Sequence, residues 1–493
     1  MSRLSLKTLR RLPPDIARPR YDVSAVRVGV VHLGVGAFHR AHQAVYLDDR
    51  LAAGETQWAI CGASLRSPQT SRALAPQDGL YALSLRGAEG EDVRVIGALR
   101  RLVGAGETLL AAMSDPAVRI VTLTVTEKGY CHDPASRVLD EDHPDIRHDL
   151  ANRHAPRSAP GFLVEALARR RAAGTAPFAV VSCDNLPSNG ETARAVIARL
   201  AELRDAGLGG WVKGEVAFPL TMVDRIVPAT MDEDRARIAA RLGVEDAWPV
   251  VAEPFSQWVI EDRFPNGRPR FEESGATLVG DVAPFELAKL RLLNGAHSTL
   301  AYLGYLCGYE TVAEAMADEN LARLVAELMT EEAAPTLDAR ATGDLQPYIR
   351  QLLARFRNPA LRHRTWQIAM DGSQKLPQRL LGTARARLVA GQPIERIALG
   401  VAAWMRYVAG VDEQGRAIDV RDPLAARLRT ICDREGLEAA RLAPALAAVR
   451  EIFGADLASD PRFLAPVTSA LTALIAKGAR RAVADYVRTA QSA

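Results

Sequence analysis

The chain has 493 residues, of which 48% are hydrophobic and 25% charged, and its formal net charge at pH 7 is +3. This length exceeds what one hydrophobic core usually serves, so we expect two or three domains. The composition is ordinary for a globular protein. Acidic and basic residues are interspersed, with no basic stripe that would indicate nucleic acid as a partner.

The cysteine pattern and the N-terminal sequence bear on location. The five cysteines are odd in number and form no C-x-x-C pair, which argues against a disulfide framework or a zinc ribbon. The first 21 residues lack the apolar core of a signal peptide, and no apolar run reaches the length of a membrane span. We therefore expect a cytoplasmic protein that does not interact with a membrane.

A glycine-rich turn follows the first apolar run of the chain. Residues 27–33 predict a strand, and residues 41–50 predict a helix. A strand, a glycine turn and a helix N-terminus together bind phosphate through backbone N–H groups and the helix dipole. A purely structural turn is the alternative. The candidate cofactor-binding residues are Gly34, Gly36, Ala37, Phe38 and His39.

The second predicted strand, residues 58–65, bears on the choice between NAD and NADP. An acidic residue at its end would bind the adenosine ribose of NAD, but residues 64–69 contain no aspartate or glutamate. Arg66 is placed to face the 2′-phosphate of NADP instead. From these residues alone, both cofactors stay open.

Further strands and helices alternate up to about residue 183. Strands are predicted at 94–96, 118–126 and 178–183, with helices at 108–113 and 162–172 between them. This alternation predicts an α/β domain of the Rossmann type, with a parallel sheet covered on both faces. Such folds bind ligands at the carboxyl ends of the strands. The polar residues at these ends include Glu127, Lys128 and Asn185.

An aspartate and an arginine interrupt a later apolar run. Asp224 and Arg225 stand within residues 218–228, which predicts a buried or half-buried ion pair. A structural pair is at least as compatible with this pattern as a catalytic one. A separate pair, His39 and His42, has the spacing of metal ligands, but no third ligand is evident, so we expect no metal site.

From residue 283 onward the pattern is almost entirely helical. We therefore divide the chain into a Rossmann-type domain, residues 1–282, and a mainly α-helical domain, residues 283–493. Two stretches, 358–364 and 371–377, are predicted as loops. Helices are predicted at 284–306, 310–316, 319–331, 345–356, 376–389, 394–409, 423–434, 437–453 and 462–489.

The first of these helices carries three polar residues in an otherwise apolar sequence: Lys289, Asn294 and His297. At about 100° per residue they fall within an arc of roughly 140° and can line one pocket. Burial disfavours the charged form of a lysine, so such a side chain can act as a general base near neutral pH. The asparagine can stabilise a developing oxyanion, and the histidine can fix a substrate hydroxyl. The alternative is a snorkelling lysine with two satisfied core polar groups.

Taken together, these motifs resemble the polyol-specific long-chain dehydrogenase/reductase family, whose best-known member is mannitol 2-dehydrogenase. The resemblance covers about residues 27–450. The matching stretches are the turn at 34–43, Thr124-Val-Thr-Glu127-x-Gly129-Tyr130, Asp184-Asn185, Thr221-Met-Val-Asp224-Arg225, and Lys289-x4-Asn294-x2-His297. The resemblance implies an NAD(P)-dependent, metal-independent oxidoreductase.

The resemblance also implies roles for single residues. The family's general base falls on Lys289, its two oxyanion-stabilising asparagines on Asn185 and Asn294, and its substrate-positioning histidine on His297. The glutamate linked to proton escape falls on Glu127. Two further residues match positions near the substrate: Asp224 and Lys375.

Within the family, three stretches resemble the fructuronate reductases, also called D-mannonate oxidoreductases: 126–131, 362–377 and 404–407. A uronate carries a carboxylate that a polyol lacks, and Lys128, Arg362 and Arg364 are extra cations that can pair with it. Surface charge is the alternative for the two arginines. The resemblance favours NAD(H) as cofactor. Oxidation of a polyol such as mannitol or arabinitol, and a catalytically silent nucleotide-binding sensor, remain alternative functions.

Overall fold

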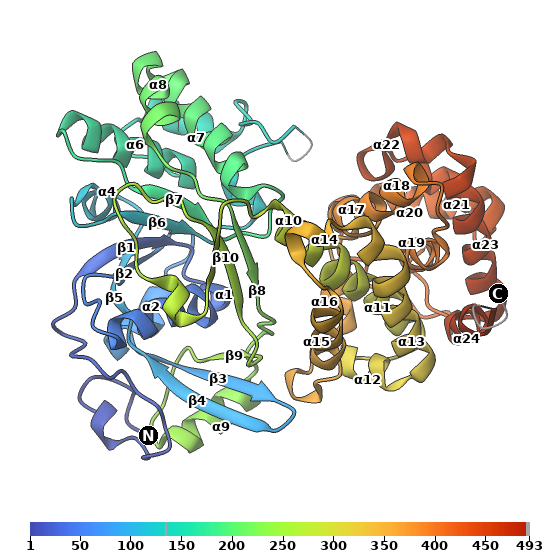
Figure 1. Cartoon of the computed structure of the whole chain (residues 1–493), viewed down its shortest axis with the longest axis horizontal. Helices are drawn as coiled ribbons and strands as arrows, with labels where there is room; N and C mark the ends of the chain where they lie inside the picture. Colours follow the sequence, from blue (N-terminus) through green and yellow to red (C-terminus); the bar gives the residue numbers. More distant parts are fainter. Residues whose placement is uncertain (134–135, 490–493) are drawn as a thin grey trace. The chain divides into compact units, whose positions relative to one another are not determined.

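The computed structural model describes residues 1–133 and 136–489, and the chain divides into two compact units, Met1–Ala283 and Pro284–Ala493 (Figure 1). The first unit is α/β and the second is mainly helical, as the sequence predicts. Among the described residues, no helix is both long and apolar enough to cross a membrane. Each unit is described by itself.

The first unit is built on a five-stranded parallel sheet in the order β5-β2-β1-β6-β7. Side chains alternate across it: Val30 faces one layer of the core, whereas Val31 and Leu33 face the other. Burial on both faces is typical of parallel sheets. The strands are β1 (Val28–Leu33), β2 (Ala59–Ser64), β5 (Leu99–Gly104), β6 (Ile120–Leu123) and β7 (Ala179–Ser182).

Helices cover both faces of this sheet. Apolar residues of α4, α6, α7 and α8 pack on the face that carries Val31, and α2 packs on the opposite face together with Trp58 and Trp258 (Figure 1). The helices of this unit are α1 (Ala37–Ala41), α2 (Gln43–Ala52), α3 (Gln69–Leu74), α4 (Glu107–Ser114), α5 (Pro144–Ala151), α6 (Ala159–Ala172), α7 (Asn189–Arg204), α8 (Ala206–Glu215) and α9 (Asp232–Leu242).

Two small sheets accompany the parallel one, and they correct one strand assignment. The predicted strand 94–96 belongs to β4 (Gly90–Ile96), which forms an antiparallel hairpin with β3 (Tyr81–Gly87); β3 also pairs with β9 (Val250–Ala252). The third strand of the parallel sheet is instead β5, which we did not predict because Arg100 and Arg101 interrupt its apolar residues. The other small sheet joins β8 (Thr221–Asp224), β10 (Gln257–Glu261) and β11 (Thr277–Val279).

The second unit packs its helices around one large apolar core, in which α11 and α19 are buried along almost their whole length. Its helices are α10 (Ala283–Ala288), α11 (Gly295–Leu306), α12 (Val312–Ala317), α13 (Glu319–Glu327), α14 (Ala339–Thr342), α15 (Gln346–Phe356), α16 (Thr365–Ala369), α17 (Gly372–Leu376), α18 (Gly382–Val389), α19 (Glu395–Val408), α20 (Ala425–Glu435), α21 (Ala439–Ala447), α22 (Arg450–Ser459), α23 (Pro461–Lys477) and α24 (Ala479–Thr489).

Two helix predictions and one loop prediction in this unit need correction. The predicted helix 462–489 is two helices, because Gly478 adopts a positive φ of 77° between α23 and α24. The predicted helix 437–453 is likewise divided between α21 and α22. The stretch 371–377 is not a loop: α17 occupies most of it, so Lys375 is held on a helix.

The helix that carries Lys289 is not a regular α-helix. Between α10 and α11, residues Lys289–Asn294 form a wider π-helical turn. A π-helix places residue i+5 next to residue i along the axis, whereas an α-helix would leave them about 140° apart. The wide turn therefore brings Lys289 and Asn294 toward the same face, and π-turns of this kind are frequent at functional sites.

Gly295, directly after this turn, lies against the backbone of a second π-helical turn, Pro377–Leu381. A Cβ atom at Gly295 would lie 2.7 Å from the carbonyl oxygen of Arg379. Only glycine permits this approach, and the approach places the segment that carries Lys375 and Arg379 beside the start of α11.

We expect Gly295→Ala to destabilise the helical unit by about 1–3 kcal/mol, the usual cost of crowding a packed core. Gly382→Ala is the matched control, because Gly382 is also helical and its added Cβ would have 3.6 Å to the nearest atom. The control should be neutral or stabilise by up to about 1 kcal/mol. Urea unfolding measures both changes. Equal stabilities for the two variants would contradict the close contact.

Candidate active site

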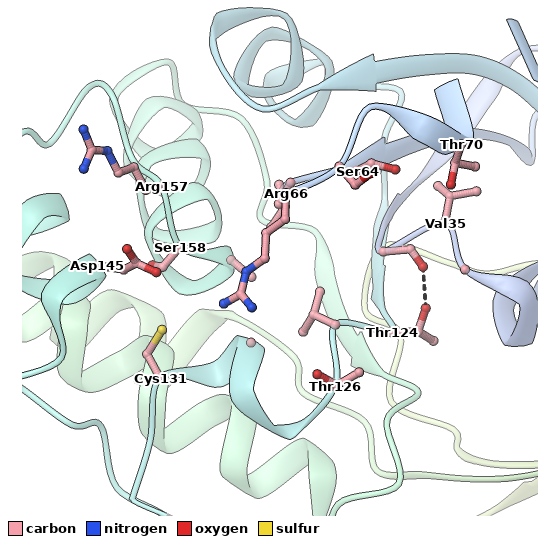
Figure 2. Close-up of a pocket in the computed structure, with 17 residues that line it drawn as sticks. Val35, Ser64, Arg66, Thr70, Thr124, Thr126, Cys131, Asp145, Arg157 and Ser158 are labelled. Carbon is pink, nitrogen blue, oxygen red and sulfur yellow. Dashed lines mark hydrogen bonds between the residues drawn. The ribbon is translucent and has the colours of Figure 1, made fainter. Parts of the chain in front are cut away.

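A pocket of about 840 Å³, including its open mouth, lies at the carboxyl ends of β1, β2 and β6 in the first unit (Figure 2). The strand order reverses at this position, with β5 and β2 on one side of β1 and β6 and β7 on the other. Open α/β sheets bind their ligands at this kind of switch point. The residues that line it include Gly34, Gly36, Ser64, Arg66, Thr70, Thr124 and Ser158.

Gly34 shapes the floor of this pocket. Its φ is +97°, and an added Cβ would lie 2.1 Å from the carbonyl oxygen of Thr124. The Thr124 hydroxyl in turn donates a hydrogen bond of 2.7 Å to the Gly34 carbonyl, drawn as the dashed line in Figure 2. The ends of β1 and β6 are therefore joined so closely that glycine is required at residue 34.

Gly36 has a different role, because it caps the N-terminus of α1 and faces open space. The nearest atom to an added Cβ there is 3.8 Å away, and its φ of −87° suits any residue. A bare backbone at an exposed helix N-terminus is what the pyrophosphate of a dinucleotide requires. The residues present thus fit a dinucleotide.

The other turn residues support the pocket rather than line it. Phe38 stacks on His42, and His39 is fully buried against His32 with ring centroids 3.4 Å apart. Burial lowers the pKa of His39 well below its usual value, so the ring is neutral. Ala37 is the first residue of α1 and is half-buried.

Residues far along the chain hold the kink between α1 and α2. The guanidinium of Arg225 donates to the carbonyl oxygen of Ala41 at 2.6 Å, and His42 Nε2 lies 2.9 Å from the carbonyl oxygen of Gln257. Arg225 also donates to the carbonyl of Glu253. Its charge is therefore held by backbone oxygens, and it has a structural role beneath the phosphate-binding turn.

Arg66 follows β2 and lines this pocket. It is exposed, and Figure 2 shows its side chain extending from the end of β2 toward Cys131, whereas Arg157 points away. No carboxylate follows β2 between residues 64 and 70. The structure thus keeps the cation that the sequence predicts, in a position that does not repel a 2′-phosphate.

A buried carboxylate joins the ends of β6 and β7. Asp184 accepts the N–H groups of Val125 and Thr126 at 3.0 and 2.8 Å and the hydroxyl of Tyr130 at 2.8 Å. Burial raises its pKa to about 6. These bonds fix the loop after β6 against the residue that precedes Asn185. As a result Glu127, which is half-buried, and two exposed residues, Lys128 and Asn185, project from neighbouring strand ends.

Asp224 is the last residue of β8 and is buried, at 3% exposure. The start of the same strand is tied to the end of β7, because the Thr221 hydroxyl donates to the Ser182 carbonyl at 2.6 Å. The predicted substrate residue thus lies on a strand anchored beside the parallel sheet.

One group of potential metal ligands occurs among the residues that the structure describes. Cys131, His143 and Asp145 have ligand atoms within 4.8 Å of one another. His143 Nδ1 accepts the N–H of Asp145 as the cap of α5, and burial with nearby carboxylates raises the pKa of the Cys131 thiol to about 12. His143 Nδ1 is thus engaged as a helix cap, and a metal-independent reaction stays our prediction.

In the helical unit, Lys289, Asn294 and His297 are all buried, at 7–8% exposure. Two of their polar atoms, Asn294 Nδ2 and His297 Nε2, have no hydrogen-bond partner among the described residues. Buried polar groups are normally paired, so these two atoms of Asn294 and His297, on one helix, indicate a ligand site. Burial and nearby cations lower the pKa of His297 well below its usual value, so its ring is a neutral hydrogen-bonding group.

Two cations approach this helix from the neighbouring segment. Lys375 donates to the carbonyl oxygens of Ile368 and Met370 at 3.2 and 2.5 Å, and burial together with Arg379 lowers its pKa to about 8. Arg379 donates to the Ser298 hydroxyl at 3.0 Å. The helix face near His297 is therefore electropositive.

The histidine between Arg362 and Arg364 was not singled out in the sequence. His363 lies edge-on to His297 with ring centroids 4.9 Å apart, and its Nδ1 is buried without a partner among the described residues. Arg362 is exposed, and Arg364 lies 3.9 Å from Glu310. The sequence indicates the two flanking arginines by their charge, whereas only the tertiary contact with His297 identifies His363. The substrate-binding roles of the two arginines remain predictions.

Comparisons with known proteins agree with this arrangement. Residues 28–273 match the mannitol dehydrogenase Rossmann domain, and residues 281–475 match the mannitol dehydrogenase C-terminal domain. The chain is 48% identical to D-mannonate oxidoreductase of Escherichia coli, over 95% of this chain and 98% of that protein. It is 47% identical to the uncharacterised oxidoreductase YeiQ of the same organism, over 97% and 98%.

A solved structure shares the whole fold. Mannitol 2-dehydrogenase of Pseudomonas fluorescens, in a ternary complex with NAD and D-mannitol, superposes with a TM-score of 0.91 at 39% identity, over 99% of both chains. The fold and the pocket define an NAD(P)-dependent dehydrogenase acting on a CH–OH group. The chain belongs to the mannitol dehydrogenase family, whose members act on polyols and sugar acids.

The two glycines of the turn separate folding from cofactor binding. Gly36→Ala should fold like the wild type but bind the cofactor at least about tenfold more weakly, because its methyl group blocks the approach of the pyrophosphate. Gly34→Ala should instead lower stability by about 1–3 kcal/mol through backbone strain. NADH fluorescence titration and thermal unfolding distinguish the two. Unchanged NADH affinity in Gly36→Ala would contradict the assigned phosphate site.

Proposed function

We propose that the protein interconverts D-fructuronate and D-mannonate with NAD(H) as cofactor. The main support is the electropositive helix face at His297, which suits a substrate that carries a carboxylate. The 48% identity to D-mannonate oxidoreductase and the NAD bound by the mannitol 2-dehydrogenase point in the same direction.

The proposed reaction assigns the proton transfer to Lys289. In the reducing direction, the C5 carbonyl carbon of fructuronate accepts a hydride from the nicotinamide, and the carbonyl oxygen accepts a proton from the Lys289 ammonium group. In the oxidising direction the neutral amine takes that proton back, so no metal is needed to activate the oxygen. The buried position of Lys289 keeps water away from this transfer.

Six further residues complete the proposed site. Asn185 and Asn294 donate hydrogen bonds to the oxygen on which negative charge grows, and the unpaired Nδ2 of Asn294 is available for this bond. His297 hydrogen-bonds a substrate hydroxyl through Nε2. Glu127, which lies in the loop fixed by Asp184, passes the proton released in oxidation toward solvent. Asp224 and Lys375 hold the substrate.

Oxidation of a polyol is the second candidate. It is favoured by the solved relative, which holds D-mannitol at 39% identity to this chain. The two candidates share the same proton and hydride transfers, and they differ in whether the substrate brings a negative charge.

A substrate panel tests the proposal directly. We expect kcat/KM for fructuronate with NADH to exceed the values for tagaturonate, fructose, mannitol and arabinitol, and the value for fructuronate with NADPH. Each factor of ten corresponds to about 1.4 kcal/mol of transition-state binding. A higher kcat/KM for mannitol or arabinitol would replace the uronate assignment with the polyol one. A higher value with NADPH would mean that Arg66 binds the 2′-phosphate. NADH binding without turnover of any substrate would revive the nucleotide sensor.

Lys289→Ala should reduce kcat by more than the ~10²–10³ that loss of one oxyanion-stabilising donor costs, because the proton donor itself is removed. Asn294→Ala provides that reference value within the same helix. NADH affinity should stay at the wild-type value in both variants, since neither residue lies in the dinucleotide-binding unit. Near-normal turnover by Lys289→Ala would refute the assigned mechanism.

A further inference from the structure

A cluster of cationic and neutral donors surrounds His297, one helical turn beyond Asn294. Phe356 stacks on one face of the His297 ring at 5.1 Å, and His363 meets it edge-on. Arg379 is hydrogen-bonded to Ser298, which follows His297 along α11. Lys375 is close enough to lower the pKa of both histidines. Four elements of the fold therefore meet at this point.

The cluster contains more hydrogen-bond donors than acceptors among the described residues. A guanidinium has five N–H groups, and Ser298 Oγ is the one hydrogen-bond acceptor found for Arg379 among the described residues. Lys375 uses two of its three N–H groups on backbone carbonyls. His363 Nδ1 is buried and has no partner in the described part of the chain. Lys375 and Arg379 are half-buried, and cations largely removed from water are usually paired with carboxylates, so their unused N–H groups indicate an anionic ligand.

The spacing along α11 matches the substrate. In fructuronate the carboxylate carbon, C1, is four bonds from the carbonyl carbon, C5, which is about 5 Å in an extended chain. Ser298 is four residues beyond Asn294, and four residues of α-helix advance by about 6 Å. With the carbonyl oxygen at Lys289 and Asn294, a substrate that extends toward the C-terminus of α11 would place its carboxylate beside His297 and Ser298.

We propose that His363, Lys375 and Arg379 form a carboxylate subsite in which His363 is a residue that determines specificity for sugar acids over neutral sugars. This inference rests on the proposed function, since it supplies the part of the site that a uronate needs and a polyol does not. A hydrogen bond from the His363 N–H orients the carboxylate, while Lys375 and Arg379 supply the positive charge that pairs with it. Asp371 and Asp422 are the acidic groups that act on Lys375.

Two substitutions of His363 separate recognition from packing. His363→Phe keeps an aromatic ring against His297 but removes the hydrogen bond, whereas His363→Asn loses the ring but keeps an N–H near the Nδ1 position. A packing role predicts that the asparagine variant is the more damaged. The carboxylate subsite predicts the reverse for fructuronate, and little change in either variant for fructose.

The measured quantity is the ratio of kcat/KM for fructuronate over fructose. We expect this ratio to fall about ten- to a hundredfold in His363→Phe, mostly through KM, and less than about threefold in His363→Asn. Arg357→Met, which removes an exposed cation next to Phe356, is the control and should keep the wild-type ratio. An unchanged ratio in His363→Phe, or an equal loss for both substrates, would overturn the subsite.

An inhibition experiment distinguishes failure of the proposed function from failure of the carboxylate subsite. If the wild type oxidises mannitol and does not reduce fructuronate, D-mannonate is tested as a competitive inhibitor of mannitol oxidation. Inhibition that weakens at least about tenfold in His363→Phe but not in Arg357→Met would preserve the carboxylate subsite without the uronate reaction. No inhibition of the wild type by millimolar D-mannonate would refute the subsite as well.

Discussion

The contact between Gly295 and the carbonyl of Arg379 is the constraint on which the helical unit depends. Without a side chain at Gly295, two π-helical turns lie against each other, one carrying Lys289 and Asn294 and the other carrying Arg379. The groups proposed to move the proton and those proposed to read the carboxylate are thereby held on one rigid framework. Their relative positions depend on backbone packing rather than on flexible side chains, which is the preorganisation that electrostatic catalysis requires.

In the dinucleotide-binding unit, a comparable constraint acts between strand ends. Gly34 permits β1 and β6 to approach, and Asp184 ties β6 to β7 through three hydrogen bonds. Burial raises the pKa of Asp184 to about 6, and its three hydrogen bonds act in the opposite direction by stabilising the carboxylate. The loop that bears Glu127 is held against the end of β7 by this carboxylate.

The fold class was predictable because its signals are local. Apolar runs that end in glycine or polar residues mark β1, β6 and β7, and the helical period marks the second unit. The predictions failed where local and tertiary preferences diverge. Arg100 and Arg101 interrupt the apolar pattern of β5, so the sequence does not predict this strand. Gly478 divides a helix whose apolar pattern is continuous. For the site, spacing identified Lys289, Asn294 and His297 as neighbours, but the π-turn that aligns them is not visible in the sequence. His363 lies 66 residues from His297, and no local pattern joins them.

The support of the phosphate-binding turn has a consequence for synthesis of the chain. Ala41 is hydrogen-bonded to Arg225, 184 positions later, and His42 is hydrogen-bonded to Gln257, 215 positions later. Strand β3 likewise pairs with β9, which is synthesised much later. On the ribosome, the turn is therefore made early but stays without its supports until more than half of the protein has emerged. Lys289 follows Gln257 after only a short stretch, so the nascent chain completes the supports of this turn shortly before it adds the proposed proton donor.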